Sequence, residues 1–206
     1  MSREQHVEHF VGPGTQRYYA ESANRLGRQY ESLTFEDAHE AFLPFLPPSP
    51  ATAADIGAGT GRDAAALAAR GYEITAVEPV QELRLLAQRL HPNPSITWLE
   101  DSLPTLSRLQ GPFGLILLSA VWMHLEETER PTAMTRLHGL LAPAGRLLIS
   151  LRHGPPPANR RMYDVSDEET IALAERCGLR LLNHTADTTD HLGRTHVHWG
   201  SLAFAR

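Results

Sequence analysis

A glycine-rich turn between an expected strand and an expected helix is the feature that most restricts how this chain folds. An apolar run, residues 51–56, precedes the turn, and an alanine-rich segment of helical character, residues 62–70, follows it. The turn itself reads Asp55-Ile56-Gly57-Ala58-Gly59-Thr60-Gly61. Glycine permits the sharp backbone reversal that such a loop requires. This order of segments indicates the first strand–helix unit of an open parallel sheet.

Segments of strand and helix character alternate along the rest of the chain. We expect helices over residues 62–70, 80–90, 103–109, 126–141 and 167–177. Strands are expected over residues 51–56, 73–77, 96–99, 114–118, 146–151, 180–183 and 196–205. This alternation predicts an α/β fold: a Rossmann-like, doubly wound, mostly parallel sheet of seven strands. No helix separates the last two strands, so the final strand is expected to be antiparallel.

The segment before the first strand has helical spacing of apolar residues and predicts two helices joined near Ser32-Leu33-Thr34. The proline-rich stretch around Pro47 ends the second of them. Residues 1–14 are expected to be a mobile tail. Residues 15–206 are expected to form one domain, with N-terminal helices over 15–50 and the core over 51–206.

Composition restricts the partners. The chain has 206 residues and a net charge of −5, and no basic stripe stands out, so nucleic acid is an unlikely partner. A single cysteine excludes an internal disulfide and a cysteine-based metal site. The chain lacks an apolar run of membrane-spanning length and a secretory signal. We expect a cytoplasmic monomer or homodimer with a small-molecule substrate and no membrane association.

The glycine loop predicts a ligand site, because ligands of such sheets lie beyond the carboxyl ends of the strands. The dinucleotide fingerprint G-x-G-x-x-G is matched at Gly57 and Gly59, but its third position holds Arg62. The ending of a phosphate-binding Walker loop is absent as well. The loop instead reads D-x-G-x-G-x-G, with Gly61 as its third glycine.

Two further acids follow neighbouring strands. Glu78 ends the second strand, where a carboxylate hydrogen-bonds ribose hydroxyls in folds of this kind. Asp101 follows the third strand and can accept a hydrogen bond from an adenine amino group. Either acid alone is explained by solvation or helix capping. Together with the glycine loop they predict a nucleoside site.

On these residues the chain resembles the class I S-adenosylmethionine-dependent methyltransferases, from about Tyr19 to the C-terminus. Residues 55–61 resemble the first motif of the family, Glu78 its ribose-binding acid and Asp101-Ser102 its adenine-binding element. Residues 118–125, LSAVWMHL, resemble the segment beside the reacting sulfonium, which includes Ser119, and residues 141–148 the turn before the fifth strand. The resemblance implies S-adenosylmethionine as cofactor.

The chain departs from the family pattern at two places. Gly114 follows Phe113 where many relatives have aspartate, a position that is usually structural. The asparagine-proline-proline-aromatic tetrad of amino-group methyltransferases is replaced by Ser-Ala-Val-Trp at residues 119–122, which argues against methylation of an adenine amino group.

Several residues are candidates for roles around the cofactor. Arg62 and Asp63 are expected to hold the carboxylate and ammonium groups of its methionine part. Tyr30, in the N-terminal helices that form a lid in the family, is expected to contact the cofactor. His124 is the candidate catalytic base, because an ordinary imidazole titrates near neutral pH. The alternative interpretations are that Arg62 and Asp63 form a surface pair, that Tyr30 packs in the core, and that His124 only packs or caps a helix.

The acceptor site is expected to involve residues after the fourth and fifth strands, because loops at that edge of the sheet carry function. The candidates are Trp122, Met123, Arg152, His153 and Tyr163. His191, His196 and His198 are candidate metal ligands, but no acid lies nearer in sequence than Asp190, and no metal is expected.

Four functions remain open at this point. The first is in-line transfer of the methyl group to a small-molecule acceptor. The second is a cyclase or lyase that consumes S-adenosylmethionine itself and releases methylthioadenosine, since the fold alone does not determine the reaction. The third is a non-catalytic cofactor-binding partner of another protein. The fourth, a nicotinamide-dependent oxidoreductase, is disfavoured by Arg62 at the third glycine position.

Overall fold

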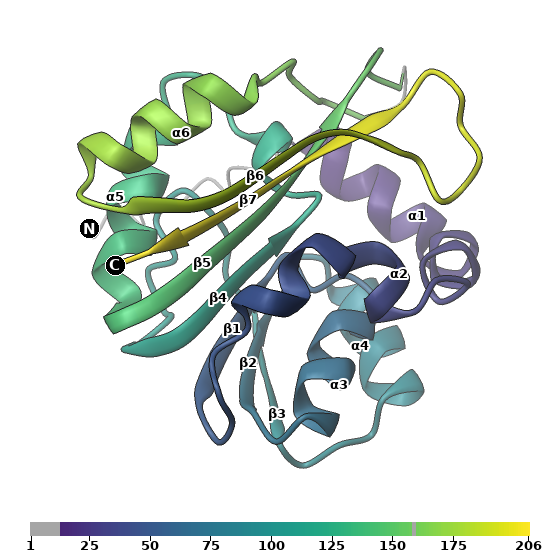
Figure 1. Ribbon diagram of the computed structural model, residues 1–206. Helices are drawn as coiled ribbons and strands as arrows, with labels where there is room; N and C mark the ends of the chain where they lie inside the picture. The colour runs from purple at the N-terminus through teal and green to yellow at the C-terminus, as the bar shows by residue number, and fades with distance from the viewer. Residues whose placement is uncertain (1–12, 158–159) are drawn as a thin grey trace, which may run out of the picture.

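The computed structural model describes residues 13–157 and 160–206 (Figure 1). The first twelve residues of the expected tail lie outside the described part. Pro13 and Gly14 already belong to helix α1 (Pro13–Tyr30), which therefore begins two residues before the expected N-terminal helices.

The core is one seven-stranded sheet with the order β3-β2-β1-β4-β5-β7-β6. The prediction of a Rossmann-like sheet is confirmed, and β7 is the antiparallel strand, inserted between β5 and β6. The strands are β1 (Thr52–Ile56), β2 (Glu73–Val77), β3 (Ile96–Leu99), β4 (Phe113–Ser119), β5 (Leu141–His153), β6 (Arg180–Thr189) and β7 (His198–Ala205).

Helices cover both faces of the sheet (Figure 1). One face carries α5 (Arg130–Leu140) and α6 (Asp167–Arg176); the other carries α3 (Arg62–Ala69), α4 (Gln81–Leu90), α2 (Phe35–His39) and the 3₁₀-helix η1 (Glu40–Phe45). Strand β4 shows why both faces need cover. Its residues alternate between two separate cores: Ile116 and Leu118 pack in one, Leu115 and Leu117 in the other.

The N-terminal helices lie at the ligand end of the sheet, where α1 packs on α4. The expected junction near residue 34 is present. The Thr34 hydroxyl accepts a hydrogen bond from the Asp37 backbone N–H at 3.0 Å, and the Asp37 carboxylate accepts from the Thr34 N–H at 3.1 Å. This reciprocal capping starts α2 and fixes the direction in which the chain returns over the sheet.

The expected helix over residues 103–109 is wrong, because the segment forms a compact loop. Leu106 has a positive φ of 43°, outside the helical region. Arg136 of α5 donates hydrogen bonds to the carbonyl oxygens of Thr105, Leu106 and Leu109, which replaces the hydrogen bonding of a helix. Asp101 also holds this loop, because its carboxylate accepts hydrogen bonds from backbone N–H groups of the segment.

The last two strands are displaced from the expected ranges. Strand β6 extends to Thr189, and β7 begins at His198, which leaves His196 outside the sheet. Strand β5 reaches His153, which pairs with His198. The end of β5, the end of β6 and the start of β7 thus lie side by side at the same edge of the sheet as the glycine loop. None of the described helices combines the length and the hydropathy needed to cross a membrane.

We expect Arg136→Met to lower the free energy of unfolding by about 1–3 kcal/mol, because three backbone carbonyls lose a charged donor. Chemical denaturation measures this change. Arg176→Met, at an exposed position of α6, is the matched control and should stay within about 0.5 kcal/mol of the wild type. Equal effects of the two substitutions would show that Arg136 does not hold the loop.

Candidate functional site

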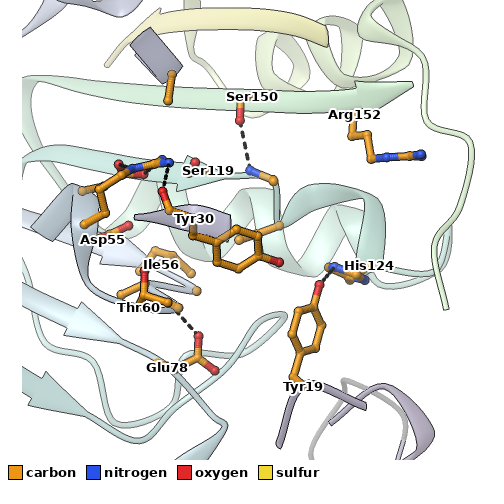
Figure 2. Close-up of a pocket in the computed structure, with 18 of the residues that line it drawn as sticks. Tyr19, Tyr30, Asp55, Ile56, Thr60, Glu78, Ser119, His124, Ser150 and Arg152 are labelled. Atoms are coloured by element: carbon orange, nitrogen blue, oxygen red, sulfur yellow. Dashed lines mark hydrogen bonds and ion pairs between the residues drawn. The ribbon is translucent and has the colours of Figure 1, made fainter. Parts of the chain in front are cut away.

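A deep cavity lies at the carboxyl ends of the parallel strands, beneath α1 and α2 (Figure 2). It is lined by residues of the N-terminal helices, of the segments that follow β1, β2, β3 and β4, and of strands β5 and β7. Asp55 and Glu78 lie toward one end, Tyr30 near the middle, and His124 and Arg152 toward the other end. This is the edge at which the sequence predicted a ligand site.

The glycine loop connects β1 to α3 and leaves backbone exposed to the cavity. Gly57 has a φ of +72°, and a Cβ there would lie 2.5 Å from a methyl carbon of Val121. Gly59 has a φ of +56°, but a Cβ there would meet nothing nearer than the Gly57 carbonyl oxygen at 3.9 Å. Gly59 therefore faces open space, which leaves room for a ligand against the main chain.

Glu78 binds the loop from the neighbouring strand. Its carboxylate accepts hydrogen bonds from the backbone N–H of Gly59 at 2.9 Å and from that of Val80 at 2.8 Å. The contact follows from the register of the parallel pair, in which Ile56 lies beside Val77. The residue is 5% exposed, and burial raises the pKa of its carboxyl group to about 7 against the two hydrogen bonds that lower it.

Asp55 and Asp63 lie under the loop with opposite electrostatic environments. Asp55 is 1% exposed, and no described side chain donates a hydrogen bond to its carboxylate, which interacts favourably with the Ala64 backbone N–H and the nearby charge of Arg62. Burial, reinforced by the charge of Asp63, raises its pKa well above the usual range. Burial alone would also raise the pKa of Asp63, but His39 at 2.8 Å and Arg62 at 2.7 Å hold it well below that range.

Arg62 already has partners. Its guanidinium contacts Asp63 through two nitrogens and donates a further hydrogen bond to the Tyr30 carbonyl oxygen at 3.3 Å. The two residues expected to hold the two ends of a methionine group therefore pair with each other, and both line the cavity. Tyr30 itself projects its ring into the middle of the site, as Figure 2 shows.

Asp101 lines the cavity and also organises the loop that follows it. One carboxylate oxygen accepts from the backbone N–H of Ser102 at 2.9 Å. The other accepts from Arg108 N–H at 2.7 Å and Leu109 N–H at 3.0 Å. The residue is buried, so these hydrogen bonds replace solvation of the carboxylate. Its structural task was not evident from the sequence.

The His124 imidazole is held in one neutral tautomer. Its Nδ1–H donates to the Arg161 carbonyl oxygen at 2.7 Å, and its Nε2 accepts from the Tyr19 hydroxyl at 3.1 Å. Burial, with the nearby charge of Arg160, lowers its pKa to about 4. The expectation of an ordinary imidazole pKa is therefore wrong. At neutral pH this histidine is an oriented hydrogen-bond acceptor.

Four of the expected acceptor residues are not among those lining the cavity. Trp122 and Met123 are fully buried in the core beneath η2 (Trp122–His124). His153 points to the opposite side of β5 from its neighbour Arg152, as alternation along a strand requires, and contacts Asp167 at 3.0 Å. Tyr163 donates its hydroxyl hydrogen to Glu126 at 3.0 Å. Arg152 alone of the five lines the cavity.

Sequence reasoning missed several lining residues, chiefly His39, Arg160, Asp190, Arg194 and Trp199. The signal for His39 was available: it occupies the apolar face of the α2 segment between Phe35 and Phe42 and is 3% exposed. Arg160, Asp190 and Arg194 lie in a loop and in the β6–β7 connection, where periodicity carries no information, whereas Trp199 lies near the start of strand β7 beside Arg152. Among the described side chains, no group of three or more histidines, cysteines or acids is placed to hold a metal.

Comparison with known proteins agrees with this architecture. Residues 53–145 match a family model described as a methyltransferase domain. An uncharacterized methyltransferase of Mycobacterium tuberculosis is 35% identical over 106 residues, which are 48% of this chain and 53% of that protein. Its counterpart in Mycobacterium bovis matches equally. The chain thus spans about half the length of the curated relatives it matches.

Two solved structures share the fold over most of the chain. A 1,6-didemethyltoxoflavin-N1-methyltransferase of Burkholderia thailandensis has a TM-score of 0.72 at 23% identity and covers 93% of this chain and 86% of its own. A TehB-like S-adenosylmethionine-dependent methyltransferase of Corynebacterium glutamicum has a TM-score of 0.69 at 21% identity, with coverages of 92% and 99%. At these identities the likeness establishes the fold.

The sheet order and the glycine loop beneath a helical cover are those of a Rossmann-like fold shared with S-adenosylmethionine-dependent methyltransferases. Within this fold, residues 53–145 match the methyltransferase-domain family model and include the glycine loop, Glu78 and Asp101.

We expect Asp101→Ala to lower the free energy of unfolding by about 2–3 kcal/mol, because three backbone N–H groups lose their acceptor. Amide hydrogen exchange at Ser102, Arg108 and Leu109 should accelerate. Asp164→Ala, at an exposed position, is the control and should leave both unchanged. Unaltered exchange at the three amides of Asp101→Ala would contradict the structural role.

Proposed function

We propose that this chain transfers the methyl group of S-adenosylmethionine to a small-molecule acceptor and releases S-adenosylhomocysteine. The observation that carries the proposal is the extent of the cavity. The glycine loop and Glu78 line one end, and Arg152, Met162 and Trp199 line the other. A cavity with space beyond the cofactor end suits a second substrate, whereas chemistry within S-adenosylmethionine alone needs none.

The residues at the first end fit the cofactor by their donors and acceptors. Glu78 suits the ribose hydroxyls, because its carboxylate lines the cavity beside the backbone N–H of Gly59. Asp55 offers a buried carboxylate to which no described side chain donates a hydrogen bond, which suits the ammonium group of the methionine part. In this proposal Arg62 and Asp63 complete the methionine end, Asp101, Ser102 and Tyr30 adjoin the nucleoside, and Ser119 lies beside the sulfur.

The cofactor supplies a methyl group already activated by a sulfonium, so the protein mainly needs to align an acceptor and exclude water. Tyr19 is positioned for this task. Its hydroxyl donates to His124 Nε2 and accepts from Arg160 at 2.9 Å. Burial and nearby Tyr30 raise the Tyr19 pKa, so the hydroxyl stays protonated. His124 acts here by orienting Tyr19, since its low pKa makes it a weak base.

The similar structures support a small-molecule acceptor by what their names state. One acts on 1,6-didemethyltoxoflavin, and another, at a TM-score of 0.67 and 16% identity, is a magnesium protoporphyrin IX methyltransferase of Synechocystis. These substrates belong to those proteins. Their relevance is that the same fold serves ring-shaped small molecules.

Mass spectrometry with methyl-labelled S-adenosylmethionine tests the proposal. We expect S-adenosylhomocysteine to accumulate only when a metabolite extract is added, together with a product that carries the labelled methyl group. Glu78→Ala should abolish the formation of S-adenosylhomocysteine and of the labelled product. Glu82→Ala, at an exposed site on α4, should still form the two compounds. Methylthioadenosine formed without extract would contradict transfer and show that the cofactor is the substrate. Binding without turnover would indicate a non-catalytic partner protein.

We expect the affinity for S-adenosylhomocysteine to rise with pH between about 6 and 8. Ribose hydroxyls donate to an ionised carboxylate, and the pKa of Glu78 is about 7 without ligand. Binding therefore lowers that pKa and releases a proton. At pH 6 about a tenth of Glu78 is ionised, so affinity should be up to about tenfold weaker than at pH 8.

Isothermal titration calorimetry at pH 7 in two buffers of different ionisation enthalpy measures the proton release. Glu78→Gln cannot release this proton, so its binding heat should depend less on the buffer than that of the wild type. The same buffer dependence in both proteins would contradict the role of Glu78.

A further inference from the structure

The end of the cavity away from Glu78 has an excess of positive charge. Arg152, Arg160 and Arg194 line it, and Asp190 is the only carboxylate among the described residues that line that end. Burial and the charges of Arg194 and Arg160 lower the pKa of Arg152, which places the three guanidinium groups within each other's electrostatic reach. With one carboxylate and three guanidinium groups, this end of the cavity has a net positive charge.

Asp190 does not correct the imbalance, because Arg194 and Trp199 already use it. One carboxylate oxygen accepts from Arg194 Nη2 at 2.6 Å and from Trp199 Nε1 at 2.9 Å. The other accepts from the Nε and the backbone N–H of Arg194, both at 3.0 Å. These donors hold the pKa of Asp190 well below its usual range, against burial that would raise it. Its hydrogen-bonding capacity is therefore filled.

Arg152 is 7% exposed and has only neutral partners among the described residues. Its two terminal nitrogens donate to the carbonyl oxygens of Gly154 at 3.2 Å and Pro155 at 3.1 Å. Its Nε is buried without any hydrogen-bond partner in the part of the chain that the structure describes. Asp190 acts on Arg152 only at a distance, and a buried cation without a direct ion pair or a full set of acceptors is unfavourable by itself.

Arg160 faces a similar environment. It donates to the Tyr19 hydroxyl at 2.9 Å, and its guanidinium lies 5.4 Å from the ring centres of both Tyr18 and Tyr19. Its Nε is also buried and unpaired within the described chain. The same end of the cavity carries Met162, Leu192 and Trp199, which provide apolar and aromatic surface.

We propose that the acceptor is an aromatic or similarly planar carboxylic acid whose carboxylate is bound by Arg152 and Arg160. This inference rests on the proposed function, since it assigns the second end of the cavity to the acceptor. The acceptor's ring packs on Trp199 and Leu192 while its anion supplies the missing charge and the missing hydrogen-bond acceptors. The positive charge of the cofactor's sulfonium also favours a negatively charged acceptor.

Binding to the protein saturated with S-adenosylhomocysteine tests the inference without any turnover. The probes are benzoate against benzamide and indole-3-acetate against indole-3-acetamide, measured by calorimetry or ligand-observed NMR. Each pair differs chiefly in charge. We expect at least one carboxylate to bind about tenfold or more tightly than its amide, as for a charge-assisted hydrogen bond in a buried site.

Arg152→Met should reduce this preference to about one, and Arg160→Met should reduce it in part, because each substitution removes one cation while retaining bulk. Arg152→Lys should keep part of the preference. Arg176→Met, at an exposed position, should keep all of it. The affinity for S-adenosylhomocysteine, measured on every variant, reports whether the fold is intact.

Absence of a carboxylate preference in the wild type, or a preference that survives in a folded Arg152→Met, overturns the inference. Either result leaves methyl transfer itself open, because turnover is measured separately with the metabolite extract. Conversely, a carboxylate preference that depends on Arg152 supports the subsite even if no methylated product is found.

Discussion

The burial of charged side chains at the ends of parallel strands is the constraint on which the site depends. Asp55, Glu78 and Asp101 follow or end three adjacent strands and are each less than 7% exposed. A carboxylate in such a place needs donors, and the structure meets this need in different ways. Glu78 and Asp101 accept backbone N–H groups, which ties the loops to the sheet. Asp55 accepts from no described side chain and burial raises its pKa, so in the proposed function a cationic ligand group stabilises its ionised form.

The two ends of the cavity have opposite electrostatic character. In the proposed function, the acids lie where the cofactor's ammonium and ribose groups fit, and Arg152 and Arg160, each with a buried Nε that lacks a hydrogen-bond partner among the described residues, lie where an acceptor fits. Tyr19 lies at the second end, with its hydroxyl shared by His124 and Arg160. This arrangement gives each ligand a preferred end, because a molecule placed the wrong way round would bring like charges together.

The sequence predicted the sheet because strand and helix signals in an α/β fold are local: the apolar run of β4 and the glycines after β1 need no distant partner to be recognised. It also placed Glu78 and Asp55 correctly in the cavity, since the strand order determines where they lie. It failed for Trp122 and His153, whose direction depends on a turn and on strand alternation. It also missed the His124 pKa, which depends on burial by α1, and the helix expected at residues 103–109, which Arg136 and Asp101 hold as a loop.

The extended strands β5, β6 and β7 supply part of the cavity lining from a late part of the sequence, which affects how such a protein can change its specificity. The segment that matches the family model ends at residue 145, whereas Arg152, Asp190, Arg194 and Trp199 all lie after it. The two halves of the site are therefore encoded in separate stretches of the gene. If the proposed function holds, insertions or exchanges in the connection between β6 and β7 alter which molecules enter while the segment with the glycine loop keeps its sequence, so new specificities arise without rebuilding the cofactor site.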